Sequence, residues 1–340
     1  MPSIPSSGEA MTEAPVLSVR NLTVDFPTRR GTLVAVNDVS FEVAKGEVLG
    51  IVGESGAGKS LTGAAIIGLL EPPGRISSGE VRLAGDRIDN MPAPELRRVR
   101  GRRIGMVFQD PLTSLNPLYT VGRQIIETVR THSDVSLADA RQRAIDLLTE
   151  VGIPGAAQRL DAYPHEFSGG MRQRVVIALA LAAGPELVIA DEPTTALDVS
   201  VQAQVIAVLK RMCREKGTAI ILITHDMGVI AETADRVAVM YAGRIVEIGP
   251  LRDVVKSAHH PYTRGLMGSI PTLESGHDRL AQIPGSMPRL TDIPAGCAFN
   301  PRCGEVMPQC RTIRPELTPV GRSQVACHLM TTARGKAQVP

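Results

Sequence analysis

Gly53-Glu54-Ser55-Gly56-Ala57-Gly58-Lys59-Ser60 is the stretch of sequence that decides the fold. It matches the pattern G-x-x-x-x-G-K-[ST], with the apolar run Val48 to Val52 before it and the helix-forming run Leu61 to Leu70 after it. A strand, a glycine-rich loop and a helix are the context in which this pattern binds phosphate. A flexible glycine and serine loop carrying a surface lysine is the alternative, and it does not account for the flanking strand and helix. The stretch therefore predicts a nucleoside triphosphate site.

The chemistry of this loop follows from its residue types. Its glycines allow a tight turn that points backbone N–H groups at phosphate oxygens, and the positive end of the following helix adds to the attraction. Lys59 is expected to reach the β and γ phosphates, and the Ser60 hydroxyl to ligate Mg²⁺. The residues expected to contact ATP here are Gly53, Glu54, Ser55, Gly56, Ala57, Gly58, Lys59, Ser60 and Leu61.

Length and composition limit the possible number of structural units and the possible partners. The chain has 340 residues, enough for two or three structural units, and its net charge of +2 gives no support for a nucleic-acid partner. The longest apolar run, Val175 to Pro185, is far shorter than the roughly 18 to 20 residues that span a bilayer. No secretory signal is visible, so the five cysteines are not expected to form disulfides. The basic stretch Arg97 to Arg103 is expected to be a solvated helix end.

Strands and helices are predicted to alternate along most of the chain. Val16 to Phe26 and Val34 to Val43 predict an antiparallel pair, and an apolar hairpin is expected around Ala242-Gly243. The fold class is α/β, with a mostly parallel sheet, an antiparallel β subdomain and an inserted helical subdomain at about 110–182. We expect a disordered tail at 1–14, a nucleotide-binding domain at 15–256 and an irregular, proline-rich extension at 257–340.

Leu187 to Glu192 is an apolar strand that ends in two carboxylates. Beside the phosphate loop, Asp191 is expected to hold Mg²⁺ and Glu192 to polarise the water that attacks the γ-phosphorus. The alternative is a helix N-terminus that carries acidic residues for electrostatic reasons alone.

Further motifs identify a family. Phe167-Ser168-Gly169-Gly170-Met171-Arg172-Gln173 opens a helix, and Ala196-Leu197-Asp198 comes just after the acidic pair. Gln109 follows a predicted strand at Ile104 to Phe108, and His225 follows another at Ala219 to Thr224. Their order and spacing between Val16 and Val255 resemble the nucleotide-binding subunit of ATP-binding cassette (ABC) proteins. Phe167 and Met171 replace the leucine and glutamine that are frequent in this family.

The resemblance implies catalytic roles around Lys59 and Glu192. Gln109 would sense Mg²⁺ and the attacking water, and His225 would contact the γ-phosphate and position the water of Glu192. Phe26 would stack on adenine. Each has a structural alternative: a turn residue for Gln109, a helix cap for His225 and a core residue for Phe26.

The resemblance also implies a dimer. Ser168, Gly169 and Gly170 would bind the γ-phosphate of ATP held by a second ATPase subunit, and Asp198 would lie in a loop that crosses the interface. Each ATP is sandwiched between two subunits in this family, so that ATP joins them and hydrolysis releases them. Ser168 has a helix cap as its structural alternative.

Two stretches indicate a branch of the family. Asp110 to Pro117 and Ile283-Pro284-Gly285 closely resemble the ATPase subunits of bacterial oligopeptide and dipeptide importers. That resemblance implies a peripheral protein on the cytoplasmic face of the inner membrane, with two polytopic permease subunits, a second ATPase subunit that is usually a paralogue, and an indirectly acting solute-binding protein. Nickel, glutathione or another small solute is the alternative cargo, and an ABC ATPase acting on nucleic acid or ribosomes is the alternative class.

Four late cysteines, Cys297, Cys303, Cys310 and Cys327, are separated by five, six and sixteen residues. This spacing favours neither zinc nor the common ferredoxin patterns. Some members of the peptide-importer branch hold a [4Fe–4S] cluster through four cysteines in a similar arrangement, so the resemblance implies a cluster here. Unligated buried thiols are the alternative. Cys213 is expected in the core.

Overall fold

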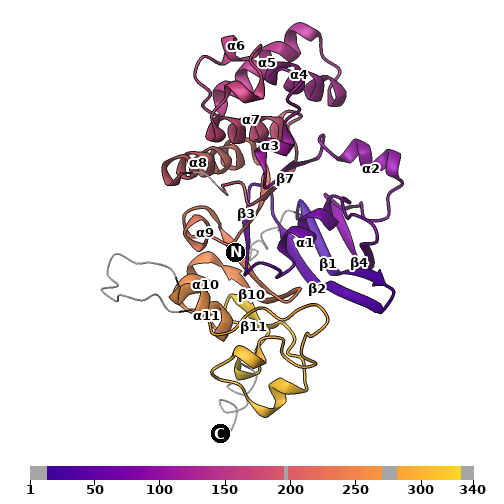
Figure 1. Cartoon of the computed structure of the whole chain (residues 1–340), viewed down its shortest axis with the longest axis vertical. Coiled ribbons are helices and arrows are strands. Elements are labelled where there is room, and N and C mark those ends of the chain that lie inside the picture. The colour runs from indigo at the N-terminus through magenta and orange to yellow at the C-terminus, as the bar shows by residue number, and fades with distance from the viewer. Residues whose placement is uncertain (1–13, 195–197, 270–281, 331–340) are drawn as a thin grey trace, which may run out of the picture.

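The computed structural model describes residues 14–194, 198–269 and 282–330. Figure 1 shows an elongated molecule with a helical block at one end, two sheets in the middle and the C-terminal extension at the other end. The predicted tail at 1–14 lies outside the described residues except for Ala14. No helix in the described part of the chain has the length and apolarity that crossing a membrane requires.

The larger sheet carries the phosphate loop. Its eight strands lie in the order β11, β12, β10, β9, β3, β8, β7, β6, and the five from β9 to β6 run parallel. Both faces of the parallel part are covered, which explains why its strands are continuous apolar runs. The bounds are β3 Val48–Val52, β6 Ile104–Val107, β7 Leu187–Asp191, β8 Ala219–Thr224, β9 Arg236–Tyr241, β10 Arg244–Pro250, β11 Thr318–Val320 and β12 Ser323–Val325.

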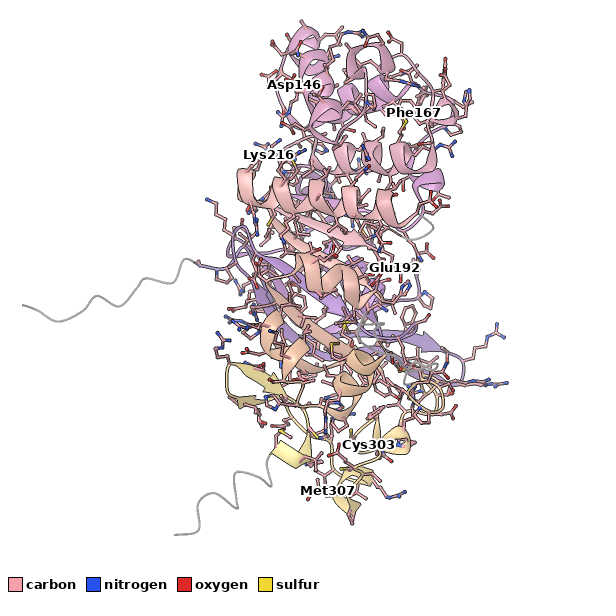
Figure 2. All side chains as sticks on the ribbon, turned by 90° about the vertical axis from the view of Figure 1, so that its left-hand side faces the viewer. Asp146, Phe167, Glu192, Lys216, Cys303 and Met307 are labelled. Carbon is pink, nitrogen blue, oxygen red and sulfur yellow. The ribbon has the colours of Figure 1, made fainter. Side chains whose placement is uncertain are left out.

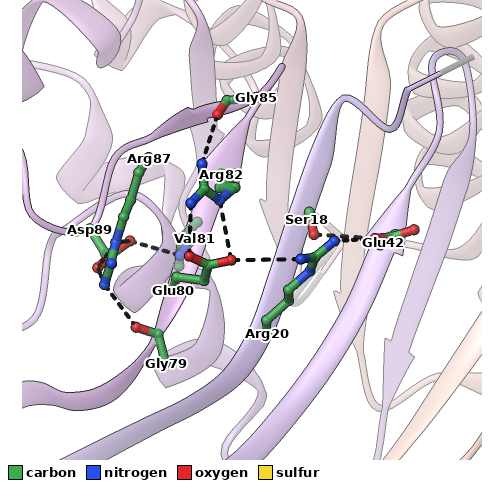
Figure 3. Close-up of polar contacts among 10 residues, drawn as sticks. All are labelled: Ser18, Arg20, Glu42, Gly79, Glu80, Val81, Arg82, Gly85, Arg87 and Asp89. Carbon is green, nitrogen blue, oxygen red and sulfur yellow. Dashed lines mark hydrogen bonds and ion pairs between the residues drawn. The ribbon is translucent and has the colours of Figure 1, made fainter.

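The smaller sheet is the predicted antiparallel subdomain, in the order β2, β1, β4, β5. Its strands are β1 Leu17–Thr28, β2 Gly31–Val43, β4 Arg75–Leu83 and β5 Asp86–Arg87. Figure 3 shows a ladder of charges across its outer face, where Arg20 pairs with both Glu42 and Glu80 and Arg82 pairs with Glu80. Because water screens such exposed pairs, the buried side chains between the two sheets stabilise this subdomain.

Helices α3 to α7 form the block at the top of Figure 1. The helices are α1 Lys59–Ile66, α2 Ala93–Val99, α3 Pro111–Ser114, α4 Val121–His132, α5 Leu137–Glu150, α6 Ala156–Arg159, α7 Gly169–Leu181, α8 Val199–Lys216, α9 Met227–Thr233, α10 Leu251–Lys256 and α11 Pro261–Gly268. The expected cap of α5 is present, since Asp139 N donates to Ser136 Oγ at 3.1 Å. Helix α1 ends before the predicted Leu70, because the chain turns at Gly68 with φ 69°.

The sequence interpretation of the basic stretch was wrong for two residues, Arg100 and Arg103. The guanidinium of Arg100 donates to the carbonyl oxygens of Ile67 and Gly68. Arg103 is not a solvated side chain at a helix end, because its guanidinium lies 2.6 Å from Glu186 and 2.7 Å from Asp86. It therefore joins the end of α2 to the start of β7 and to β5. Arg97 and Arg98 are exposed, as expected.

The C-terminal extension is more closely joined to the core than an irregular appendage would be. Its strands β11 and β12 continue the larger sheet, with Glu247 opposite Val325. Phe299 is buried in the main core, where its ring contacts Tyr241 and Tyr262 at centroid distances of 5.3 Å. Aromatic packing against the larger sheet therefore orders this segment.

Candidate functional site

The candidate site lies where parallel strands end. Strands β3, β8, β7 and β6 are parallel, so their carboxyl ends meet at one edge of the sheet. The phosphate loop follows β3, Glu192 follows β7, His225 follows β8 and Gln109 comes two residues after β6. Residues far apart in the sequence are thereby brought to one place.

Glycine is required at two positions of the loop. Gly53 has φ 153°, and a side chain there would place Cβ 2.3 Å from the Met240 carbonyl oxygen. Gly58 has φ 99°, and its Cβ would lie 3.1 Å from the Ala35 carbonyl oxygen. Both positions need the left-handed region together with a close backbone approach, which only glycine permits without strain.

Lys59 is buried beneath the loop. Its Nζ donates to the carbonyl oxygens of Gly53 at 2.8 Å and Glu54 at 3.1 Å. Burial lowers the pKa of Lys59, while the carboxylates of Glu192 and Asp191 oppose that effect. The ammonium is therefore held by oxygen atoms at the position where phosphate oxygens would be bound.

Ser60 and Asp191 form a pair of oxygen ligands. Ser60 Oγ donates to Asp191 Oδ1 at 3.0 Å, and burial raises the pKa of the Asp191 carboxyl. A hydroxyl and a carboxylate this close are the hard oxygen donors that Mg²⁺ binds. Because a nearby cation would favour the ionised carboxylate, Mg²⁺ is expected to reverse that shift.

Glu192 is held from two sides. Gln109 Nε2 donates to its Oε2 at 2.9 Å, and His225 Nδ1 lies 3.1 Å from its Oε1. Its backbone has φ 46°, in the left-handed region that non-glycine residues rarely adopt. The strained turn after β7 directs this carboxylate toward the residues that follow β6 and β8, so the geometry suits a positioned general base.

A cavity of about 500 Å³ is lined by Lys59, Ser60, Gln109 and Glu192. Asp191 and His225 do not line it and are joined to it through their contacts with Ser60 and Glu192. The volume of the cavity is in the range of small-ligand sites. The cavity is lined by Ala35, Ser55, Gly56, Ala57, Gly58, Lys59, Ser60, Leu61, Gln109, Glu192, Met287, Pro288, Arg289 and Leu290. One wall is therefore formed by the phosphate loop, and part of another comes from the C-terminal extension.

The signature residues are not in this cavity. Ser168 and Gly169 are exposed at the start of α7, where Ser168 Oγ accepts from Met171 N at 3.4 Å. Gly170 is also outside the cavity lining, and a Cβ there would lie 2.4 Å from Val201. Figure 2 shows the neighbouring Phe167 well separated from Glu192 along the molecule.

Two further predicted contacts also lie apart from the cavity. Phe26 is half-buried on β1, and its ring packs over Gly74, where an added Cβ would approach it to 2.7 Å. It is absent from the residues that line the cavity. Asp198 is exposed at the start of α8, while Ala196 and Leu197 lie outside the described residues.

The four late cysteines line one small space in the extension. Cys297, Cys303, Cys310 and Cys327 all contact a cavity of about 10 Å³, which has room for about one water molecule. Within the described residues, no three His, Cys, Asp or Glu side chains are arranged around a single metal position. Burial raises the pKa of the Cys297 thiol to about 11, so the thiol is protonated at neutral pH. Cys213 is in the core, as expected.

Sequence reasoning missed two residues that contact the phosphate loop. Glu54 N donates to the Tyr262 hydroxyl oxygen at 2.9 Å, and Arg302 Nη1 lies 3.0 Å from each carboxylate oxygen of Glu54. Both residues are more than 200 positions away in the sequence. No local pattern signals either contact.

Comparisons with known proteins agree with this geometry. Residues 36–195 match the family described as ABC transporter, and residues 246–310 match the family described as oligopeptide/dipeptide transporter, C-terminal region. The chain is 44% identical over 320 residues to the dipeptide transport ATP-binding protein DppD of Haemophilus influenzae, covering 94% of this chain and 97% of that protein. It is 49% identical over 315 residues to the oligopeptide transport ATP-binding protein OppD of Salmonella typhimurium, covering 91% and 94%.

Solved structures are similar over the cassette. The dimeric structure of the bacterial ABC transporter cassette MJ0796 superposes with a TM-score of 0.63 at 28% identity, covering 69% of this chain and 99% of that one. CbiO1 from Clostridium perfringens gives a TM-score of 0.62 at 30% identity, covering 72% and 92%. The expected α/β ATPase fold is thereby confirmed.

Proposed function

This chain belongs to the ABC transporter family of ATP-binding proteins, and from that premise we propose that it is the ATP-hydrolysing subunit of an importer for dipeptides or oligopeptides. The names of its relatives in Haemophilus influenzae and Salmonella typhimurium support the peptide cargo. The match of residues 246–310 to the C-terminal region of oligopeptide/dipeptide transporters supports the same branch. We also propose the division into a nucleotide-binding domain at 15–256 and an extension at 257–340.

The observation that carries the proposal is the convergence of Lys59, Ser60 with Asp191, and Glu192 on one cavity. In the proposed mechanism, the backbone of the loop and Lys59 bind the phosphates, which replace the carbonyl partners that Lys59 has now. Ser60 and Asp191 would hold Mg²⁺, which neutralises charge on the β and γ oxygens when bound.

Glu192 would act as general base. It takes a proton from the water that attacks the γ-phosphorus, while Gln109 and His225 fix the carboxylate and the water. The P–O bond to the leaving ADP breaks as the bond to the water oxygen forms, which yields inorganic phosphate. The γ-phosphate also contacts His225 in this mechanism.

A second ATPase subunit would complete the site. The exposed hydroxyl of Ser168 and the N–H groups of Gly169 and Gly170 lie outside the cavity of their own chain. A helix start with free N–H groups binds anions, so these residues would contact the γ-phosphate held by a partner, with Asp198 at the interface. The proposed partner is a paralogous ATPase.

Exposed apolar side chains after β6 support a membrane partner. Phe108, Leu118 and Tyr119 are 44%, 79% and 37% exposed around α3. Large apolar side chains left exposed within one short stretch of chain suit an interaction site. We assign it to two polytopic permease subunits, which would place the chain on the cytoplasmic face of the inner membrane, with a solute-binding protein acting on the permease from the other side.

The four cysteines are proposed to hold a [4Fe–4S] cluster. They line one cavity, and in such a cluster each thiolate ligates a different iron, so the sulfurs need not surround one point. Since the space now has room for about one water, the surrounding loops must spread to admit the cluster. Iron and sulfide contents near four atoms each after anaerobic purification, lost in Cys303→Ser and kept in Cys213→Ser, would support it. Purified protein without iron would refute it.

Isolation of the chain with its partners tests the proposal as a whole. Tagged chain would be purified in detergent from the membranes of its own cell, together with the variants Leu118→Glu and Ile313→Glu. Ile313 is an exposed apolar residue of the extension and serves as a matched control. We expect polytopic membrane proteins to accompany the wild type and Ile313→Glu but not Leu118→Glu. Co-purification with nucleic acid or ribosomes, and with no membrane protein, would contradict the proposal.

A further inference from the structure

The nucleotide cavity has a wall that comes from the C-terminal extension. Met287, Pro288, Arg289 and Leu290 line it opposite the phosphate loop, although they lie more than 200 residues later in the chain. They begin two residues after Ile283-Pro284-Gly285, a stretch to which the mechanism above gives no role. Residues 283–290 are called the wall segment below.

Arg302 fixes the wall segment to the phosphate loop. Its Nε donates to the Pro284 carbonyl oxygen at 2.7 Å, and its Nη2 donates to the carbonyls of Ile283 and Gly285 at 3.3 and 3.4 Å. Through Nη1 the same guanidinium holds the Glu54 carboxylate. Its side chain is only 7% exposed, so a planar, buried donor set joins the two walls of the cavity.

Arg289 is the cation that this wall brings to the cavity. It is exposed and lines the same space as Lys59 and Ser60. In the described part of the chain no carboxylate forms an ion pair with it, in contrast to Arg302 and Arg264, which pair with Glu54 and Glu305. A guanidinium facing a phosphate site suits charge-assisted hydrogen bonds to phosphate oxygens.

We propose that the wall segment is part of the ATP site of its own subunit and that Arg289 binds the β and γ phosphates of ATP. The inference rests on the proposed ATPase function and adds a nucleotide-binding residue from the extension. It also gives the extension a direct role in nucleotide affinity, because Arg302 sets the position of the wall segment relative to the loop.

The test measures the affinity of the full-length chain for ATP, ADP and AMP by titration calorimetry, in the presence of Mg²⁺. Arg289→Gln removes the charge, Arg289→Lys keeps it, and Arg98→Gln is the control, since Arg98 is an exposed arginine on α2 outside the cavity. For Arg289→Gln we expect affinity for ATP to fall about fivefold and affinity for AMP by less than about twofold, because the number of phosphate charges decides the loss. Arg289→Lys should keep most of the affinity and Arg98→Gln all of it.

The outcomes separate this inference from the proposed function. If the wild type binds ATP and Arg289→Gln binds ATP equally well, the inference is wrong and the ATPase function stands. Equal losses for ATP and AMP would also overturn it, since Arg289 would then contact the base, the ribose or the α-phosphate that the two nucleotides share. If the wild type itself does not bind ATP, the proposed function fails first.

Discussion

Arg302 holds both carboxylate oxygens of Glu54 at 3.0 Å, and this pair joins the residue that precedes Cys303 to the second residue of the phosphate loop. A second contact, from Glu54 N to the Tyr262 hydroxyl, supports the same loop from α11. The nucleotide loop and the extension are therefore one structural unit. Substitutions in the extension should therefore alter nucleotide binding at the ATP site.

Breaking this pair should destabilise the protein. Arg302→Gln is expected to cost about 2 kcal/mol of the free energy of unfolding, because the partly buried Glu54 carboxylate loses its charged partner. Arg322→Gln is the matched control: Arg322 also binds both carboxylate oxygens of Asp253 but is 70% exposed, so its loss should lower the free energy of unfolding much less. Urea unfolding measures both.

A double-mutant cycle checks that the partner is Glu54. Glu54→Gln and Arg302→Gln together should cost less than the sum of the two single changes, since either one already removes the pair. Additive costs would mean that Arg302 acts through the carbonyls of the wall segment alone.

Glu192→Gln should separate binding from hydrolysis. The amide keeps the shape of the side chain but cannot accept a proton from water, so ATP turnover should fall at least about 100-fold while ATP affinity is retained. The variant should accumulate as a closed dimer with ATP in size-exclusion chromatography. Normal turnover by the purified mutant complex would disprove the assignment of Glu192 as base.

Ser168→Ala should impair the dimer without changing the cavity of its own chain. Its hydroxyl lies outside that cavity, so ATP binding to the isolated subunit should be unchanged, while ATP-driven dimerisation and turnover should drop. Ser136→Ala removes an equivalent helix cap at α5 and controls for the lost cap, about 1 kcal/mol in each case. If the two substitutions lower turnover equally, Ser168 acts only as a helix cap.

Stability should fall in mild acid because of His260. Burial lowers the pKa of His260 to about 3, below its ordinary value of 6.5, and its Nδ1 accepts from Tyr262 N at 3.1 Å. The unfolded chain binds a proton that the folded chain excludes between these values, so this contribution is present at pH 7 and is lost as the pH falls below 6.5. At pH 5 the loss is about 2 kcal/mol. The free energy of unfolding would be measured at pH 7 and pH 5 for the wild type and for His260→Asn. An equal loss between these pH values in the two proteins would contradict the assignment.

Local patterns predicted the elements that carry the site. The strand before Gly53, the strand ending at Asp191 and the strand ending at Thr224 are short apolar runs buried on both faces, and each is present within about one residue of its predicted bounds. Since parallel strands place their carboxyl ends together, the predicted convergence of Lys59 and Glu192 followed from topology alone.

Contacts between distant segments could not be predicted in that way. Arg302 lies 248 positions from Glu54, and no periodicity relates an irregular loop to a phosphate loop. Strand β12 is only three residues long, so its pairing with β10 depends on tertiary packing, which buries Val325, rather than on its own sequence. The left-handed backbone of Glu192 is likewise imposed by its surroundings.

Peptide uptake into vesicles tests the central claim most directly. The chain and its co-isolated membrane proteins would be reconstituted with the solute-binding protein, and accumulation of a labelled dipeptide measured with ATP on the side of this chain. We predict uptake that requires ATP and is abolished by Glu192→Gln. Wild-type vesicles that hydrolyse ATP without accumulating any dipeptide or oligopeptide would contradict the account.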